Sequence, residues 1–144
     1  MVQVDLPEEI VKELLKYGRD IKEAVLALIR PRPSIHVDLG LEVPPETMIT
    51  RRERYIEAPW DAILRMVVMH FPPGCAGLVK VKVGVGNREV TDWIALDDTT
   101  QVFEMYEDVM EGERVWAEIR NEDTTYSHKP AVIISLIKKP EVIE

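Results

Sequence analysis

The hydrophobic pattern of this 144-residue chain changes its period at Ser34, and this change restricts what the chain can fold into. Before Ser34, apolar residues recur every three or four positions, the spacing of one face of an α-helix. After it, apolar and polar residues alternate, as in SIHVDLGLEV (34–43), the spacing of a half-buried strand. Arg30-Pro31-Arg32-Pro33 ends the helical pattern because the residue before a proline avoids the helical region. We therefore expect a helical arm (1–33), a β-domain (34–138) and a short tail (139–144).

The helical arm carries an apolar seam with heptad spacing. Further apolar residues flank the seam, namely Val11, Leu15, Val25 and Ile29. The remaining positions mix Glu, Lys, Arg and Asp, so the outer face of the helix is solvated. Two interpretations stay open: the helix packs on its own sheet, or the seam meets other copies of the chain. On the second interpretation, the contact residues of a homo-oligomer are Ile10, Leu14, Tyr17, Ile21 and Leu28.

The rest of the chain reads as short strands separated by turn residues. Phe71-Pro72-Pro73-Gly74, Gly86-Asn87, Asp97-Asp98 and Glu111-Gly112-Glu113 mark turns. Eight strands are expected, at 34–43, 47–58, 60–71, 78–85, 88–96, 101–109, 114–120 and 131–138, with a helix after Pro59 as an open alternative for the third. No βαβ rhythm appears. The sequence predicts a mainly β fold, an antiparallel β-sandwich or jelly roll with an N-terminal amphipathic helix.

Composition limits the classes of function. A net charge of −8 argues against general nucleic-acid binding, because a protein must supply positive charge to replace phosphate counterions. No apolar run reaches the ~20 residues of a membrane span, and no signal-peptide pattern opens the chain. We expect a cytoplasmic or particle-associated protein. Asn and Gln number only four beside abundant Lys, Arg and Glu, a bias typical of thermophiles.

The stretch VVMHFPPGCAGLVKVKVGVG (67–86) holds the single cysteine and four of the seven glycines. A catalytic Cys75 would need a nearby base such as His70 and an electropositive setting, and no protease signature is present. GVG lacks the third glycine of a dinucleotide loop. We therefore interpret the stretch as strand, turn and strand, with a structural thiol and no catalytic residue.

The other polar clusters have structural interpretations as well as functional ones. His36, His70 and His128 show no metal-ligand spacing, so no metal or cofactor is expected. Calcium is an open possibility for the acidic turns, although the EF-hand spacing is absent. A glycoside hydrolase is a third, weaker possibility for the acidic stretch. The turns contain Asp97, Asp98, Asn121, Glu122 and Asp123, and the stretch contains Glu104, Glu107, Asp108, Glu111 and Glu113.

Two further groups of residues suggest contacts with partners. Arg51-Arg52-Glu53-Arg54 is the one basic cluster. It could pair with an acidic patch of a neighbouring subunit or contact nucleic acid, and the structural alternative is a solvated edge strand. Trp93 and Trp116 could stack on a sugar, although tryptophans spread over several strands are usually core or interface anchors.

The segment from Trp60 to Leu136 resembles small, mostly uncharacterised β-sandwich proteins of prokaryotic viruses and mobile elements. The resemblance lies in FPPGCAGLVKVKV before a hairpin, LDDTT before an aromatic strand, a tryptophan-containing strand and NED ahead of the last strand. It implies a virion or particle component and no catalytic residues.

These observations lead to one main hypothesis and one alternative. The main hypothesis is a non-enzymatic structural or assembly protein that acts as a homo-oligomer, with other copies of itself as partners and other particle components as further candidates. The alternative is a carbohydrate-binding sandwich that uses Trp93 or Trp116.

Overall fold

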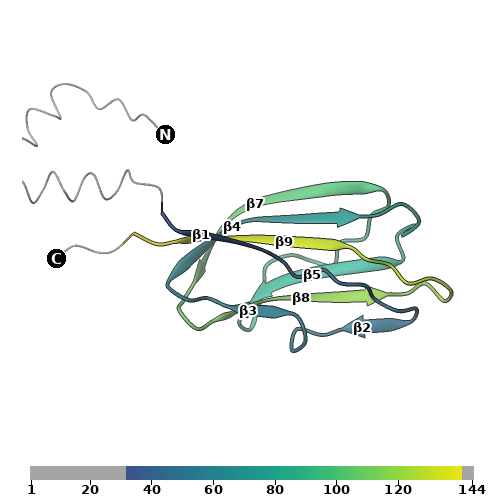
Figure 1. Cartoon of the computed structure of the whole chain (residues 1–144), viewed down its shortest axis with the longest axis horizontal. Coiled ribbons are helices and arrows are strands. Elements are labelled where there is room, and N and C mark those ends of the chain that lie inside the picture. Colours follow the sequence, from purple (N-terminus) through teal and green to yellow (C-terminus); the bar gives the residue numbers. More distant parts are fainter. Residues whose placement is uncertain (1–31, 141–144) are drawn as a thin grey trace, which may run out of the picture. The chain divides into compact units, whose positions relative to one another are not determined.

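The computed structural model describes residues 32–140, and the chain from Pro33 to Lys139 folds into antiparallel sheets (Figure 1). This range contains nine strands and no helix, hence no helix that could cross a membrane. The strands are β1 (Ser34–Asp38), β2 (Thr47–Ile49), β3 (Tyr55–Glu57), β4 (Ala62–Phe71), β5 (Val79–Val85), β6 (Arg88–Glu89), β7 (Thr99–Val109), β8 (Arg114–Asn121) and β9 (Ala131–Lys138). The predicted helical arm, with Ile10, Leu14, Tyr17, Ile21 and Leu28, lies outside the described residues.

The strands form two sheets with nested pairing. Sheet A has the order β1-β9-β4-β7, and sheet C has the order β2-β8-β5-β6, with β3 also paired to β8. The first strand thus pairs with the last, β2 with β8, β4 with β7 and β5 with β6. A long hairpin rolled up on itself produces this nesting, which is the arrangement of a jelly roll. The prediction of a mainly β fold with antiparallel sheets is confirmed.

The core lies between the two sheets and is built from alternate residues of both. Val67 and Ile134 of sheet A and Val83 and Ala117 of sheet C are all fully buried members of one cluster. Because side chains alternate across a strand, their sequence neighbours point away from the core. Each sheet therefore has an outward face whose composition decides what it can contact.

The predicted strand at 47–58 is wrong in one respect, because the chain breaks into β2 and β3. Both pieces pair with β8, Ile49 opposite Ile119 and Tyr55 opposite Trp116. The residues between them form a turn in which Glu53 N–H donates to Thr50 O at 3.0 Å. The side chain of Glu53 accepts from the N–H of Thr50 in return. The polar pattern of RRER was a signal of this turn.

Two other predicted strands are shorter than expected. The strand at 88–96 reduces to β6, followed by a single bridge between Val81 and Ile94. The ladder stops because the N–H groups of Val90 and Thr91 both donate to Val83 O, as at a bulge. The strand at 34–43 ends at Asp38, and Val43 forms only an isolated bridge with His128.

Candidate functional site

The outward face of sheet A carries apolar side chains in adjacent positions. Val67, Phe103 and Ile134 lie opposite one another and pack in the core. The next residues along each strand, Val68, Val102 and Ile133, therefore share the opposite face in one row. Met66 and Ile137 extend this apolar face. We call Met66, Val68, Val102, Ile133 and Ile137 the sheet A patch.

The sheet A patch is only partly shielded by its own strands. Val102 is 48% exposed, and the other four members are half-buried. Tyr106, nearby on β7, is 67% exposed, with the guanidinium of Arg65 5.1 Å from its ring centroid. No loop of the described residues is hydrogen-bonded across the patch. Contiguous exposed apolar side chains of this kind usually mark a contact surface.

The outward face of sheet C is different, because aromatic and charged side chains cover it. Trp116 is 2% exposed and lies against Gly84, where an added Cβ would overlap the indole. Its Nε1 donates to Gly86 O at 2.8 Å, and the guanidinium of Arg51 lies 3.8 Å from the ring centroid. Trp116 is therefore an anchor within the fold, and its ring has no free face for a sugar.

A charge network continues across the same face. Lys82 lies opposite Glu118 in the ladder, with its Nζ 3.7 Å from Glu118 Oε1 and 2.8 Å from Glu89 Oε1. Arg51 Nη2 lies 3.1 Å from the same Glu118 oxygen. Trp93 is partly buried, and its ring centroid lies 4.5 Å from Lys82 Nζ. Lys82 holds the pKa of Glu89 below its ordinary value, first through their hydrogen bond and then through charge.

Two of the three arginines in the basic cluster form hydrogen bonds or ion pairs within the β-domain. Arg51 belongs to the sheet C network, and Arg54 donates to the carbonyl oxygens of Leu39, Asp38 and Gly40. Of the three arginines, Arg52 alone forms no hydrogen bond or ion pair within residues 32–140, and it is exposed. Pairing of this cluster with an acidic neighbour would therefore rest on Arg52.

Cys75 lies at one end of the sandwich, in the loop between β4 and β5, and its side chain is fully buried. Burial raises the pKa of the thiol, and the carboxylates of Asp97 and Asp123 raise it further. A reactive cysteine needs the opposite shift. His70 forms its hydrogen bond with Thr100, 2.8 Å away, and none with Cys75. The residues around the thiol thus favour a structural role.

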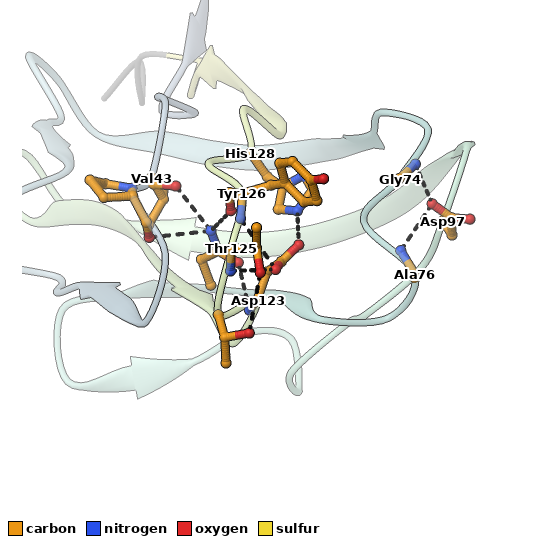
Figure 2. Close-up of polar contacts among 11 residues, drawn as sticks. Val43, Gly74, Ala76, Asp97, Asp123, Thr125, Tyr126 and His128 are labelled. Atoms are coloured by element: carbon orange, nitrogen blue, oxygen red, sulfur yellow. Dashed lines mark hydrogen bonds and ion pairs between the residues drawn. The ribbon is translucent and has the colours of Figure 1, made fainter.

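The acidic turns around Cys75 bind backbone N–H groups (Figure 2). Asp97 Oδ1 accepts from the N–H groups of Gly74 and Ala76 at 3.0 Å each, which fixes the loop that contains the cysteine. Asp123 accepts from Thr125 N–H and lies 2.8 Å from His128 Nε2. The hydrogen bond with His128 lowers the pKa of Asp123. These carboxylates cap loops.

Asn121 is buried at the end of β8 and holds the loop that follows this strand. Its Nδ2 donates to the carbonyl oxygens of Val43, Pro44 and Tyr126, and its Oδ1 accepts from Asp123 N–H. Sequence reasoning placed Asn121 among possible calcium ligands. Its amide is instead fully used by four backbone groups, which ties the loop after β8 to the chain before β2.

The histidines and carboxylates do not converge on a metal-binding cluster anywhere in residues 32–140. His36 pairs with Ser135, His70 with Thr100 and His128 with Asp123. The predicted acidic stretch is divided between β7 and the following turn. Asp108 bonds Lys139 at 2.8 Å, and Glu113 accepts from Met110 N–H.

Two of the clefts on the surface of residues 32–140 bear on function. One, of about 360 Å³, lies at the end of β2 and β8 and is lined by Met48, Arg120 and Glu122, among others. The other, of about 350 Å³, lies between β7 and the segment 90–94. Sequence reasoning missed the second cleft. Its sequence signal is the apolar pair Phe103 and Met105, two positions apart in the strand predicted at 101–109.

Comparison with known proteins gives no family. No protein-family model matches the chain, and no curated protein is significantly similar to it in sequence. Among solved structures, it is similar to a chain of the infectious bursal disease virus Gx strain, with 10% identity and a TM-score of 0.47. That match covers 79% of this chain and 34% of the viral one.

It is also similar to a family two carbohydrate esterase from Cellvibrio japonicus, with 14% identity and a TM-score of 0.37, over 77% of this chain and 36% of the esterase. The chain thus spans about a third of the length of both proteins. Likeness at this level transfers no function.

Proposed function

We propose that this protein is a non-enzymatic structural protein that acts as a homo-oligomer and uses the sheet A patch as a contact surface. The observation that carries the proposal is the contrast between the two outward faces. Sheet C covers its outward face with Arg51, Trp93 and a charge network, whereas sheet A presents Val68, Val102 and Ile133 in one row. Burial of such a row between copies would stabilise the assembly by about 25 cal/mol per Å² of apolar surface, before association costs.

The surroundings of the titratable groups support a non-enzymatic role. The Cys75 thiol is buried with a raised pKa, and His128 is engaged with Asp123. An enzyme of the hydrolase class would need a nucleophile beside a base, or paired carboxylates across a cleft. The proposal that the assembly belongs to a virion or other particle rests on the sequence resemblance alone.

The mass of the full chain in solution, measured by light scattering after size exclusion, tests the proposal. We expect a discrete oligomer that dissociates in the Val68→Lys/Ile133→Lys variant. Leu78→Lys is the matched control, because Leu78 is an exposed apolar residue outside the patch. Circular dichroism of each variant verifies that the β-fold is retained. A monomeric wild-type chain, or an unchanged mass in the double variant, would contradict the use of this surface.

The predicted seam is tested in the same experiment with Leu14→Asp/Ile21→Asp. A lower mass in solution with an intact β-fold would show that the seam forms the contact between copies. Loss of the β-fold would show that the helix packs on the sandwich of its own chain.

Carbohydrate binding is the second candidate, and it rests on Trp93. The ring is partly exposed, but Lys82 and Arg120 lie 4.5 Å and 5.1 Å from its centroid, so a sugar would have to displace a cation. A glycan array with wild type and Trp93→Ala tests this candidate, and equal binding by both proteins would count against it.

A further inference from the structure

The outer edge of β7 is a long strand edge without a strand partner among residues 32–140. β7 spans Thr99–Val109 and pairs only with β4, so it ends sheet A (Figure 1). One carbonyl on the free side, that of Asp108, accepts from Arg88 Nη2 at 2.7 Å. An open row of N–H and C=O groups is a template for another strand.

A cleft runs along the same edge. It lies between β7 and the segment 90–94, which ends sheet C on that side through the bridge of Ile94 to Val81. Its apolar lining consists of Val90, Ile94, Phe103 and Met105, which are partly buried and pack on the core. The cleft is therefore an opening of the hydrophobic core at the side of the sandwich.

The rim of the cleft is acidic. Asp92, Glu104 and Glu107 line it, and no cation pairs with any of the three within the described range. β7 itself contains no Lys, Arg, Pro or Gly. Two copies of β7 would bring the acidic side chains of both edges close together, and this repulsion disfavours pairing of the edge with itself. The charge selects a basic partner.

We propose that the β7 edge and this cleft bind an extended segment of another protein that alternates apolar and Lys or Arg residues. The segment adds a strand to sheet A by main-chain hydrogen bonds. Its apolar side chains enter the cleft beside Phe103 and Met105, and its basic side chains lie beside Glu104 and the neighbouring carboxylates. This inference does not depend on self-assembly, which the mass measurement tests separately.

A peptide probe tests the proposal on the full chain. The probe is a labelled nine-residue peptide of alternating Lys and Val with blocked ends, and its binding is followed by fluorescence anisotropy. We expect saturable binding that weakens with salt. Two controls should not bind: the same composition with Lys and Val in separate blocks, and the alternating peptide with Glu in place of Lys. Absence of binding by the alternating Lys-Val peptide would overturn the proposal.

Backbone methylation of the probe separates strand addition from simple charge attraction. The N–H groups of an added strand point alternately toward and away from β7, so all Val amides share one direction and all Lys amides the other. N-methylation of one set should abolish binding, while methylation of the other set should leave it within about twofold. Equal effects of the two sets would contradict strand addition.

A protein variant tests the role of the rim. Glu104→Gln/Glu107→Gln should weaken binding about tenfold, because charge-assisted contacts are lost. Glu42→Gln/Glu111→Gln removes the same charge from exposed sites elsewhere and should bind as wild type. Equal weakening in both variants would show that net charge, rather than this edge, attracts the probe.

Discussion

The two outward faces of the sandwich differ in how far their side chains are covered or paired within the fold. On sheet C, Trp116 packs on Gly84 beneath Arg51, and Lys82 and Glu118 face each other across the ladder. On sheet A, the patch residues Val68 and Val102 lie side by side, and no loop of residues 32–140 is hydrogen-bonded across them. A face that satisfies its own groups contributes to the stability of the single chain. A face that leaves apolar side chains partly exposed contributes less to that stability.

The comparison predicts that removal of the Trp116 side chain lowers the free energy of unfolding more than any other change considered below. Trp116→Ala should lower the free energy of unfolding by about 3–5 kcal/mol, because a fully buried indole leaves a cavity. Urea denaturation followed by circular dichroism measures the change. Tyr126→Ala is the aromatic control, since Tyr126 is 67% exposed and its loss should cost less than about 0.5 kcal/mol. A similarly small cost for Trp116 would remove the distinction between the faces.

The buried ion pair should give the next largest effect. Lys82 and Glu118 are 9% and 7% exposed, so Glu118→Ala leaves a buried ammonium short of one partner and should cost about 1–3 kcal/mol. The double variant Lys82→Leu/Glu118→Leu should recover most of that loss, because it leaves no buried charge. If the double variant is as unstable as Glu118→Ala, the hydrogen bonds and ion pairs of the network stabilise sheet C in a way that apolar side chains cannot replace.

Acid should weaken sheet C through Glu89. The pKa of this carboxyl is lowered from its ordinary value of 4.5 by Lys82, so its contribution is fully present above pH 4.5. That contribution is lost as the pH falls through the folded-state pKa, since the unfolded chain takes up the proton first. Denaturation midpoints at pH 6 and pH 3.5 should differ less in Glu89→Gln than in wild type. An equal difference in both proteins would show that Glu89 does not contribute to the acid sensitivity.

The smallest effect on folding should come from the sheet A patch. Val102→Thr should change the free energy of unfolding of the single chain by less than about 0.5 kcal/mol, because Val102 is 48% exposed. Measurement at low protein concentration separates this value from any contribution of association. A cost near that of Trp116→Ala at that concentration would mean that the patch is covered within one chain.

Sequence reasoning predicted the strands with strong alternation and missed the breaks. β9 has the predicted bounds, and β4 and β5 begin within two residues of theirs. β5 alternates strictly, whereas β4 and β9 are apolar runs that turn residues delimit. Between β2 and β3, the guanidinium of Arg54 donates to three backbone carbonyl oxygens of the chain around Leu39. This contact with a distant segment leaves no periodic signal in the sequence.

For the candidate site residues too, the sequence indicated some features and left others to the folded structure. Turn chemistry correctly indicated that Asp97 and Asp123 lie in loops, but the N–H groups that they bind depend on the folded loop geometry. The tryptophans looked equivalent in the sequence, yet Trp116 is buried under Arg51 while Trp93 is partly exposed beside Lys82. Exposure of an aromatic ring on an outward face depends on which loop crosses it.

In strictly alternating strands such as β5, alternation by itself determined which side chains face the core, because the pleat of a strand leaves only two directions. The sequence therefore determined that Val83 would be buried and that Lys82 would point outward. The tertiary structure decided the rest: that Glu118 lies opposite Lys82, that Arg51 covers Trp116, and that β7 ends its sheet. These features arise from strands that are distant in the chain, and their pairing is set by the packing of the whole sandwich.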